Sequence, residues 1–371
     1  MNILYLTNHL NVGGITSYVF ALAKGLKKRG HQIYIASSGG DLLPKFIQEG
    51  ITYIPIPIRT KSELSPKILI SLFKLSGLIK KNKIEIIHSN SRTTQVLGSL
   101  LSRFTSALHI YTCHGFFKNW LSRLLFPGWG DKVIAISEAV KGHLMNYFGV
   151  REEAIKVIHH GIDIDRFKIP ACSADRQDAK LKIEIKKKFS LGDGPVVGIV
   201  ARLSDVKGHI YLIEAMRSVL EEIPDAQLLI VGEGKMKKEL VNLCSRMEIT
   251  KNIFFIPSVY DTSEILSIMD LFVLPSLAEG LGLSLMEAMA IGLAVIGSDV
   301  GGIRNLIRNE YNGLLVKPQD TQGLSDAILG LLLDFKKRRF LADNAQIFIQ
   351  QNFSQEKMVL ETEKIYLECL T

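Results

Sequence analysis

The stretch PSLAEGLGLSLMEAMAIGLAVIGSDVGG at residues 275–302 places two glutamates in an apolar run that also contains six glycines. The pattern predicts the end of a buried strand, then a glycine-rich loop, then a helix that begins near residue 283. Glu279 then precedes the helix, and Glu287 lies about a turn and a half inside it. Gly280 and Gly282 allow the loop to adopt positive φ and to approach a ligand closely. We therefore expect a ligand-binding loop here.

The two glutamates are interpreted as hydrogen-bond acceptors for sugar hydroxyls. The free amides at the start of the helix form an anion site, which suits phosphate. Carboxylates are poor phosphate ligands but accept hydroxyl donors well. On this interpretation Glu287 holds a ribose and Glu279 the sugar that is transferred. The alternative is a helix-capping Glu279 and a solvent-facing Glu287, and the stretch alone does not decide between the two.

Upstream, the segment ARLSDVKGH at residues 201–209 joins a strand to a helix and carries two cations. Arg202 lies at the strand end, and Lys207 precedes Gly208 and the helix. A guanidinium grips phosphate oxygens bidentately, and an ammonium supplies a compact charge. The pair is predicted to neutralise a diphosphate leaving group at the carboxyl edge of a parallel sheet. The alternative is two exposed surface cations.

The whole chain alternates short apolar runs with longer amphipathic segments, which predicts an α/β protein with parallel sheets covered by helices on both sides. The length of 371 residues indicates about two domains. We expect a first domain over residues 1–168, a charged linker region over 169–190 and a second domain over 191–354. For a C-terminal helix at about 355–371, one expected arrangement is that it packs back on the first domain.

The first domain supplies two further candidates at strand ends. Gly13 and Gly14 follow the first strand and precede a helix, so their amides are placed to approach a ligand. They do not form the G-x-G-x-x-G fingerprint of a nicotinamide enzyme. His114 ends the strand LHIYTCH and is suited to donate to a substrate hydroxyl or diphosphate. The alternatives are a glycine turn without a ligand and a structural histidine.

Composition and charge exclude several classes of protein. No apolar run is long enough to span a membrane, no secretory signal is evident, and four scattered cysteines suggest neither disulfides nor zinc. A cytoplasmic location is expected. The net charge of +8 comes from residues 1–170, whose own excess is +12. This asymmetry indicates an anionic partner for the first half, or a well-solvated lysine-rich surface. Nucleic-acid signatures are absent, and no histidine spacing predicts a metal.

Taken in order, these motifs resemble the retaining glycosyltransferases of family 4, with the two-domain GT-B fold and a bacterial or archaeal cell-envelope glycan role. The resemblance covers nearly the whole chain and includes the E-x7-E spacing of Glu279 and Glu287. It rests on GGI at 13–15, TCHG at 112–115, VIAISEAVK at 133–141, GIDIDRF at 161–167, ARLSDVKG at 201–208, VGEG at 231–234 and residues 275–299.

The resemblance implies two Rossmann-like domains facing across a cleft and a nucleotide-sugar donor, with UDP-sugar favoured over GDP-sugar. It implies that Arg202 and Lys207 bind the diphosphate and that no cofactor or metal is needed. Attack on the same face, with the leaving phosphate accepting the proton, requires no enzymic nucleophile. The implied catalytic set is His114, Arg202, Lys207 and Glu279. The implied donor-binding set is Gly13, Gly14, Arg202, Lys207, Glu279, Gly280, Leu281, Gly282, Leu283 and Glu287.

The chain departs from the family pattern at three places, and these departures leave the diphosphate and ribose sites intact. His160 stands where the family often has asparagine, Arg304 and Asn305 replace a common proline–glutamate pair, and the strand IFFIPS lacks a frequent glycine. The rival predictions are a soluble disaccharide- or sugar-phosphate-forming synthase of the same fold and a catalytically silent nucleotide-sugar-binding protein.

The acceptor side of the first domain contains two segments that mix apolar residues with lysine and arginine, at 61–83 and 116–129. Interfacial segments have this composition. We hypothesise that the basic half docks peripherally on an anionic inner leaflet and glycosylates an envelope glycan or lipid-linked acceptor. The alternative is that both segments are core helices with basic outer faces.

Overall fold

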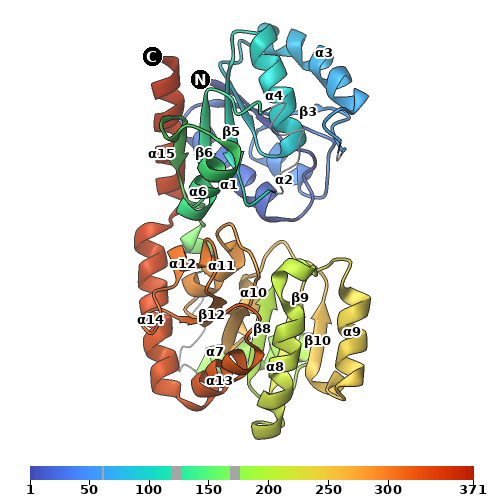
Figure 1. Cartoon of the computed structure of the whole chain (residues 1–371), viewed down its shortest axis with the longest axis vertical. Helices are drawn as coiled ribbons and strands as arrows, with labels where there is room; N and C mark the ends of the chain where they lie inside the picture. Colours follow the sequence, from blue (N-terminus) through green and yellow to red (C-terminus); the bar gives the residue numbers. More distant parts are fainter. Residues whose placement is uncertain (61, 118–126, 168–175) are drawn as a thin grey trace. The chain divides into compact units, whose positions relative to one another are not determined.

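The computed structural model describes residues 1–60, 62–117, 127–167 and 176–371, and it divides into two compact units. The first unit comprises Met1–Gly161 and Gln355–Thr371, and the second comprises Ile162–Ser354. Each unit has its own parallel sheet (Figure 1). The prediction of two Rossmann-like α/β domains is confirmed.

The sheet of the first unit has seven parallel strands in the order β3-β2-β1-β4-β5-β6-β7. Its strands are β1 Asn2–Leu6, β2 Gln32–Ser37, β3 Thr52–Pro55, β4 Ile86–Ser89, β5 Leu108–Cys113, β6 Lys132–Ala135 and β7 Ile155–Val157. Its helices are α1 Gly14–Lys28, α2 Leu43–Gln48, α3 Pro66–Lys81, α4 Arg92–Phe104, α6 Glu138–Phe148 and α15 Gln355–Leu370. The central strands are apolar on both faces because helices cover the sheet.

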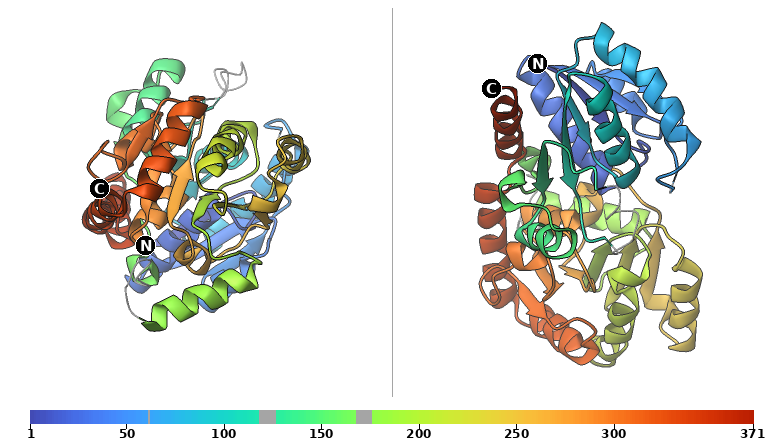
Figure 2. Two further views of the ribbon diagram at one scale, coloured as in Figure 1. Left: turned by 90° about the horizontal axis from the view of Figure 1, so that it is seen from below. Right: turned by 45° about the horizontal axis from the view of Figure 1, so that its top comes forward.

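The sheet of the second unit has six parallel strands in the order β10-β9-β8-β11-β12-β13. Its strands are β8 Val196–Val200, β9 Gln227–Val231, β10 Ile253–Ile256, β11 Leu271–Leu274, β12 Ala294–Ser298 and β13 Leu314–Val316. Its helices are α7 Arg176–Lys188, α8 His209–Glu222, α9 Lys237–Arg246, α10 Ser263–Ser267, α11 Leu283–Ala290, α12 Ile303–Leu306, α13 Thr321–Leu333 and α14 Phe335–Asn352. In Figure 1, α9 lies beside β10, and Figure 2 gives two further views of the same ribbon in the same colours.

Both sheets place their first strand in the middle and build outward in the same order, so the direction of winding reverses beside β1 in one and beside β8 in the other. In open parallel sheets the crevice for a ligand lies beyond the carboxyl ends of the strands at this reversal. The loops after β1, β4, β8 and β11 therefore occupy the position where each unit is expected to bind.

The expected linker over 169–190 is corrected by the structure. The units divide at Gly161, seven residues before the predicted boundary, and residues 176–188 form helix α7 of the second unit. Lys186 donates to the carbonyl oxygens of Asp193 and Gly194, and Lys182 pairs with Asp270 at 3.0 Å. Because its lysines outnumber its apolar residues, the sequence hides the amphipathic pattern. Residues 168–175 lie outside the described part of the chain.

Helix α15 belongs to the first unit although it ends the chain. It packs on α1, and Glu363 pairs with Arg29 at 2.7 Å and with His31 at 2.6 Å. Its fully buried Tyr366 reaches the strands, where its hydroxyl shares a hydrogen bond with Tyr5 at 3.0 Å and with His88. This helix is therefore part of the core of the first unit.

Candidate functional site

The loop after β8 carries the two predicted cations in the second unit. Arg202 is exposed, and Lys207 ends a short 3-10 helix whose C-cap is Gly208 at φ +69°. A Cβ on Gly208 would collide with the carbonyl oxygen of Pro275, at the end of β11. The glycine therefore lets the cationic loop lie directly against the loop that carries Glu279.

Lys207 and Glu279 are brought together as an ion pair between Nζ and Oε2. Their side chains are 22% and 12% exposed, so the pair is largely withdrawn from water. The hydroxyl of Ser276 donates to the same carboxylate oxygen at 3.3 Å. Each group offers its opposite charge to the other, which limits the cost of holding both largely out of water.

The glycine-rich loop between β11 and α11 is held by main-chain contacts. Gly282 is the N-cap of α11 at φ +102°, and the side chain of Leu281 is buried. The amide of Gly302 donates to the carbonyl oxygen of Glu279 at 2.8 Å, and a Cβ on Gly302 would collide with the main chain of Gly280. The crowding of glycine thus reflects close backbone packing as well as the free amides at the start of α11, at Leu283.

The N-cap of α11 is Gly282, and the carboxylate of Glu279 bonds instead to Lys207 and Ser276. Glu287 does not face solvent freely either. It is half-buried, and its Oε2 accepts a hydrogen bond of 2.9 Å from the hydroxyl of Thr262. Burial raises the pKa of Glu287 to about 7, while Thr262 and Arg166 act in the opposite direction. The structure therefore does not agree with the alternative of a helix-capping Glu279 and a solvent-facing Glu287.

Arg166, Asp261 and Thr262 surround Glu287 and were not assigned a role from the sequence. The guanidinium of Arg166 pairs with Asp261 at 2.9 Å and donates to the carbonyl oxygen of Tyr260 at 3.0 Å. Its segment contacts α11. The motif GIDIDRF contained the signal, but an arginine that meets its partners almost a hundred residues later shows no local spacing.

In the first unit, His114 follows β5 and lies between two polar side chains. Its Nε2 is 3.3 Å from Oδ1 of Asn90, and its Nδ1 is 3.2 Å from Nε2 of His160. The Tyr18 ring meets it edge-on at 4.8 Å. Because an amide oxygen only accepts, Nε2 carries the proton and Nδ1 accepts from His160. Burial, with His160 and His88 nearby, lowers the pKa of His114 well below its usual value.

Gly13 and Gly14 lie at the start of α1 and are exposed, and a Cβ on either would meet no atom within 4 Å. Packing therefore does not require glycine at these positions. Each unit holds its own set of predicted residues: His114 and these two glycines in the first, and Arg202, Lys207, Glu279 and Glu287 in the second.

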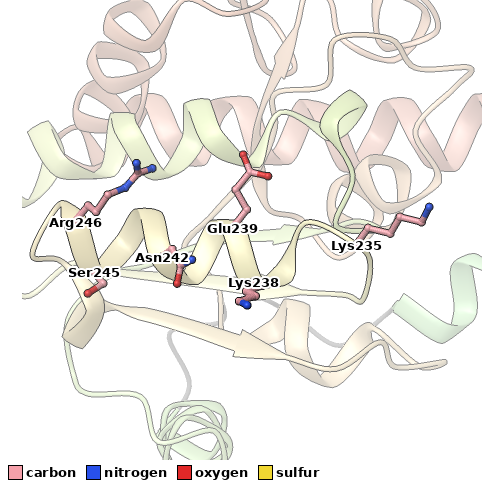
Figure 3. A pocket seen from close by; sticks show the side chains of 6 residues that line it. All are labelled: Lys235, Lys238, Glu239, Asn242, Ser245 and Arg246. Atoms are coloured by element: carbon pink, nitrogen blue, oxygen red, sulfur yellow. The ribbon is translucent and has the colours of Figure 1, made fainter.

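A pocket on the surface of the second unit contains none of these residues (Figure 3). The side chains that line it come from α9 and the preceding turn, and they point in different directions instead of toward one common point. They are Lys235, Lys238, Glu239, Asn242, Ser245 and Arg246.

Two negative findings apply to the part of the chain that the structure describes. Within it, no three or more histidine, cysteine, aspartate or glutamate side chains gather as a metal site would require. Within the same residues, no helix has both the length and the apolar character needed to cross a bilayer.

Two family models match the chain. Residues 12–166 match Glycosyltransferase Family 4, and residues 182–348 match Glycosyl transferases group 1. A similar relative, 31% identical over 350 residues, is the UDP-Gal:alpha-D-GlcNAc-diphosphoundecaprenol alpha-1,3-galactosyltransferase of Escherichia coli, and the match covers 88% of this chain and 86% of that protein. The N-acetyl-alpha-D-glucosaminyl L-malate synthase of Bacillus anthracis is 24% identical over 382 residues, covering 98% of this chain and 96% of the relative.

Among solved structures, the Anabaena protein HepE in complex with UDP-glucose superposes with a TM-score of 0.85 at 23% identity. The match covers 100% of this chain and 99% of that chain. The likeness shows the fold, which is the GT-B arrangement of two Rossmann-like domains.

Proposed function

Because this chain belongs to the family 4 glycosyltransferases, we propose that it moves a hexosyl or N-acetylhexosaminyl group from a UDP-sugar to a cell-envelope glycan or lipid-linked acceptor. The observation that carries the proposal is the ion pair of Lys207 and Glu279 at the carboxyl edge of the second sheet, with Glu287 on the helix that follows the Glu279 loop. Together these residues offer a cation for a diphosphate and two carboxylates for hydroxyls.

The donor is held in the second unit. Arg202 and Lys207 bind the diphosphate, and the amides at the start of α11 add to its charge compensation. Glu287 accepts from the ribose and Glu279 from the sugar. When the diphosphate engages Lys207, the ion pair with Glu279 loosens and the carboxylate becomes free to accept a sugar hydroxyl. In the first unit, His114 follows β5 and the Gly13–Gly14 pair starts α1, and their parts in catalysis and donor binding stay predictions.

The reaction retains configuration and needs no metal. The acceptor oxygen attacks the anomeric carbon on the face that the diphosphate leaves, the glycosidic C–O bond to phosphate breaks, and the departing phosphate oxygen takes the acceptor proton. Arg202 and Lys207 stabilise the charge that develops on the leaving group, which is a large contribution in transferases of this kind. Activity that survives EDTA and a product of the donor's own anomeric configuration are the expected results.

A thermal-shift screen of UDP-, GDP- and ADP-sugars tests the donor. A ligand that binds only the native state raises the melting temperature, and about 100-fold excess over Kd adds about 2.7 kcal/mol of stability. UDP-sugars are expected to give the largest shift, with GDP-sugars as the alternative. Equal shifts from all three bases, or none, would contradict the proposed donor.

A membrane-associated acceptor is supported by the outer face of α3. Ile68, Leu72 and Leu75 pack into the core of the first unit, so α3 is a core helix as one alternative held. Its outer face is not merely basic, because Phe73 is 80% exposed and Ile70 55% exposed. The helix contains no acidic residue and carries four lysines, at positions 67, 74, 80 and 81. Apolar side chains flanked by lysines suit an anionic bilayer surface. The segment at 116–129 lies mostly outside the described residues.

Co-sedimentation with vesicles tests this docking. The protein is expected to pellet with phosphatidylglycerol vesicles at low salt, and Phe73→Ser is expected to weaken the association. Phe335→Ser is the matched control, because Phe335 is 61% exposed in the second unit. No preference for anionic vesicles, or equal effects of both substitutions, would end the docking proposal.

A soluble small acceptor is the second candidate, favoured by the relative whose name describes a glucosaminyl-malate synthase. Radiolabelled sugar transfer separates the two. A butanol-extractable product formed with a lipid diphosphate acceptor supports the first candidate, and a water-soluble product formed with small hydroxy acids supports the second.

A further inference from the structure

The carboxylate of Glu287 is held in one orientation by a buried neighbour. Thr262 is 6% exposed, and its hydroxyl donates to Oε2 at 2.9 Å. Because water has little access to this hydroxyl, the bond persists and fixes the side chain of Glu287. A carboxylate accepts at about four lone-pair positions, so its other oxygen and the remaining positions stay available to a ligand.

Arg166 acts on Glu287 through its charge. Arg166 is 26% exposed and is clamped by Asp261 and the carbonyl oxygen of Tyr260. Its guanidinium lies 5.1 Å from the centre of the Tyr260 ring and 5.4 Å from that of Phe167. The guanidinium is thereby immobilised on the segment that contacts α11.

The charged groups that act on Glu287 are Arg166, which favours its ionised form, and Asp261, which opposes it. From α14, which packs against α11, Gln346 donates to the carbonyl oxygen of Ala290 and carries no charge. Burial is the largest influence and raises the pKa of Glu287 to about 7. With this pKa, Glu287 is partly protonated near pH 7. Its neighbours therefore change the fraction that is ionised at this pH.

A vicinal diol presents two hydroxyl donors and requires an acceptor. Ionised Glu287 accepts both, whereas the protonated acid gives up acceptor positions and adds a competing O–H donor. We propose that Thr262 and Arg166 are positioning residues that favour the ionised form of Glu287 and orient it for the ribose diol of the donor. This inference rests on the proposed function and adds two residues to the donor site.

Carbon-13 NMR of the glutamate carboxyls tests the first half of the inference in the ligand-free protein. The Glu287 signal is assigned by its loss in Glu287→Gln. Thr262→Val keeps the side-chain shape and removes the hydrogen bond, and Arg166→Gln removes the charge. Both are expected to raise the midpoint of the Glu287 titration, the first by about one pH unit, since a hydrogen bond to a charged group favours it about tenfold.

Calorimetric binding of UDP-glucose tests the second half, because its phosphates do not titrate near neutrality. The affinity of the wild type is expected to rise with pH through about 7, and the profile of Thr262→Val is expected to lie about one unit higher. At pH 7 this difference weakens binding about fivefold, and raising the pH restores it. Arg166→Lys, which keeps the charge but loses the planar fork, is expected to lie between wild type and Arg166→Gln.

Thr321→Val is the matched control, because Thr321 donates to Glu214 at 3.2 Å in the same unit. It is expected to leave the titration of Glu287 and the binding profile unchanged. A titration midpoint unmoved by Thr262→Val overturns the inference, as does a moved midpoint with an unmoved binding profile. A failure of wild-type protein to bind UDP-glucose at every pH counts against the proposed donor instead, and the NMR titration then decides the inference.

Discussion

The two sheets wind in the same order, yet the polar groups at their carboxyl edges differ in kind. Behind the strand ends of the first unit lies a neutral network, in which His88 bonds to Tyr366 and Thr112, and His114 bonds to Asn90 and His160. The corresponding edge of the second unit is charged. The same backbone arrangement therefore carries two different kinds of polar group, which the side chains at the strand ends determine.

This difference between the two edges is opposite to the distribution of net charge along the chain. The first 170 residues carry an excess of +12, and the remainder is negative. Four of the described lysines of the first unit lie on α3, at positions 67, 74, 80 and 81. A neutral edge suits hydroxyl groups of an acceptor, and a paired, charged edge suits a diphosphate. Net charge thus bears on the proposed membrane-facing surface, whereas the strand ends of the second unit carry the proposed donor site.

The largest expected effect comes from removing the ammonium at the charged edge. Lys207→Ala is expected to lower kcat by about 100-fold or more, as loss of a preorganised charge-stabilising donor does. Steady-state kinetics with the identified donor measures it. Lys337→Ala removes an exposed pair with Glu310 and is the control, expected to change kcat by less than about twofold. Equal turnover in Lys207→Ala and wild type would break the comparison, because the charged edge would then have no part in catalysis.

A smaller effect is expected from the main chain that supports this edge. Gly302→Ala places a Cβ against Gly280 and Leu281, and overpacking of this kind costs about 1–3 kcal/mol of stability. Because the amide of residue 302 holds the carbonyl of Glu279, kcat/KM is expected to fall as well. Denaturant unfolding and kinetics measure both. Gly330→Ala is the control, since a Cβ there meets no atom within 4 Å and alanine favours the helix. Destabilisation by the control instead would contradict the packing argument.

The sequence was sufficient for the fold and for individual residues, but not for their partners. Alternating apolar runs and amphipathic segments predicted two parallel sheets, and the stretch at 275–302 placed α11 at its observed start. The helix over 176–188 was missed because lysines mask its apolar face. Thr262 and Arg166 were missed for a different reason. Their relation to Glu287 arises from tertiary contacts across about 25 and 120 residues, which no periodicity records.

The neutral edge illustrates the same limit. His114 was identified from its place at a strand end, but its tautomer depends on Asn90 and His160. Histidine spacing excluded a metal motif and gave no indication of this pairing. Position at the edge of a sheet is thus readable from sequence, whereas protonation state depends on burial and on neighbours that only the folded chain brings together.

Substitution of Glu287 is expected to change stability and nucleotide binding in opposite directions. Its pKa is raised in the folded state, so the native protein binds the extra proton between about pH 4.5 and 7, and stability falls as pH rises through this window. Glu287→Gln mimics the protonated form. It is expected to raise the free energy of unfolding at pH 8 by on the order of 1 kcal/mol while weakening nucleotide binding about tenfold. Urea unfolding at pH 5 and pH 8 measures the first effect, and a variant less stable than wild type at pH 8 would contradict the assignment.

The smallest expected effect is an absence of titration at the neutral edge. Burial, His160 and His88 lower the pKa of His114 well below its usual value, so its ring is expected to stay neutral between about pH 5.5 and 8. Its Cε1–H NMR signal, assigned by its loss in His114→Gln, should not move over this range, whereas in urea it should titrate near 6.5. A midpoint near 6.5 in the folded protein would mean that the ring is solvated and charged at mildly acidic pH. The contrast between a neutral and a charged edge would then fail at His114.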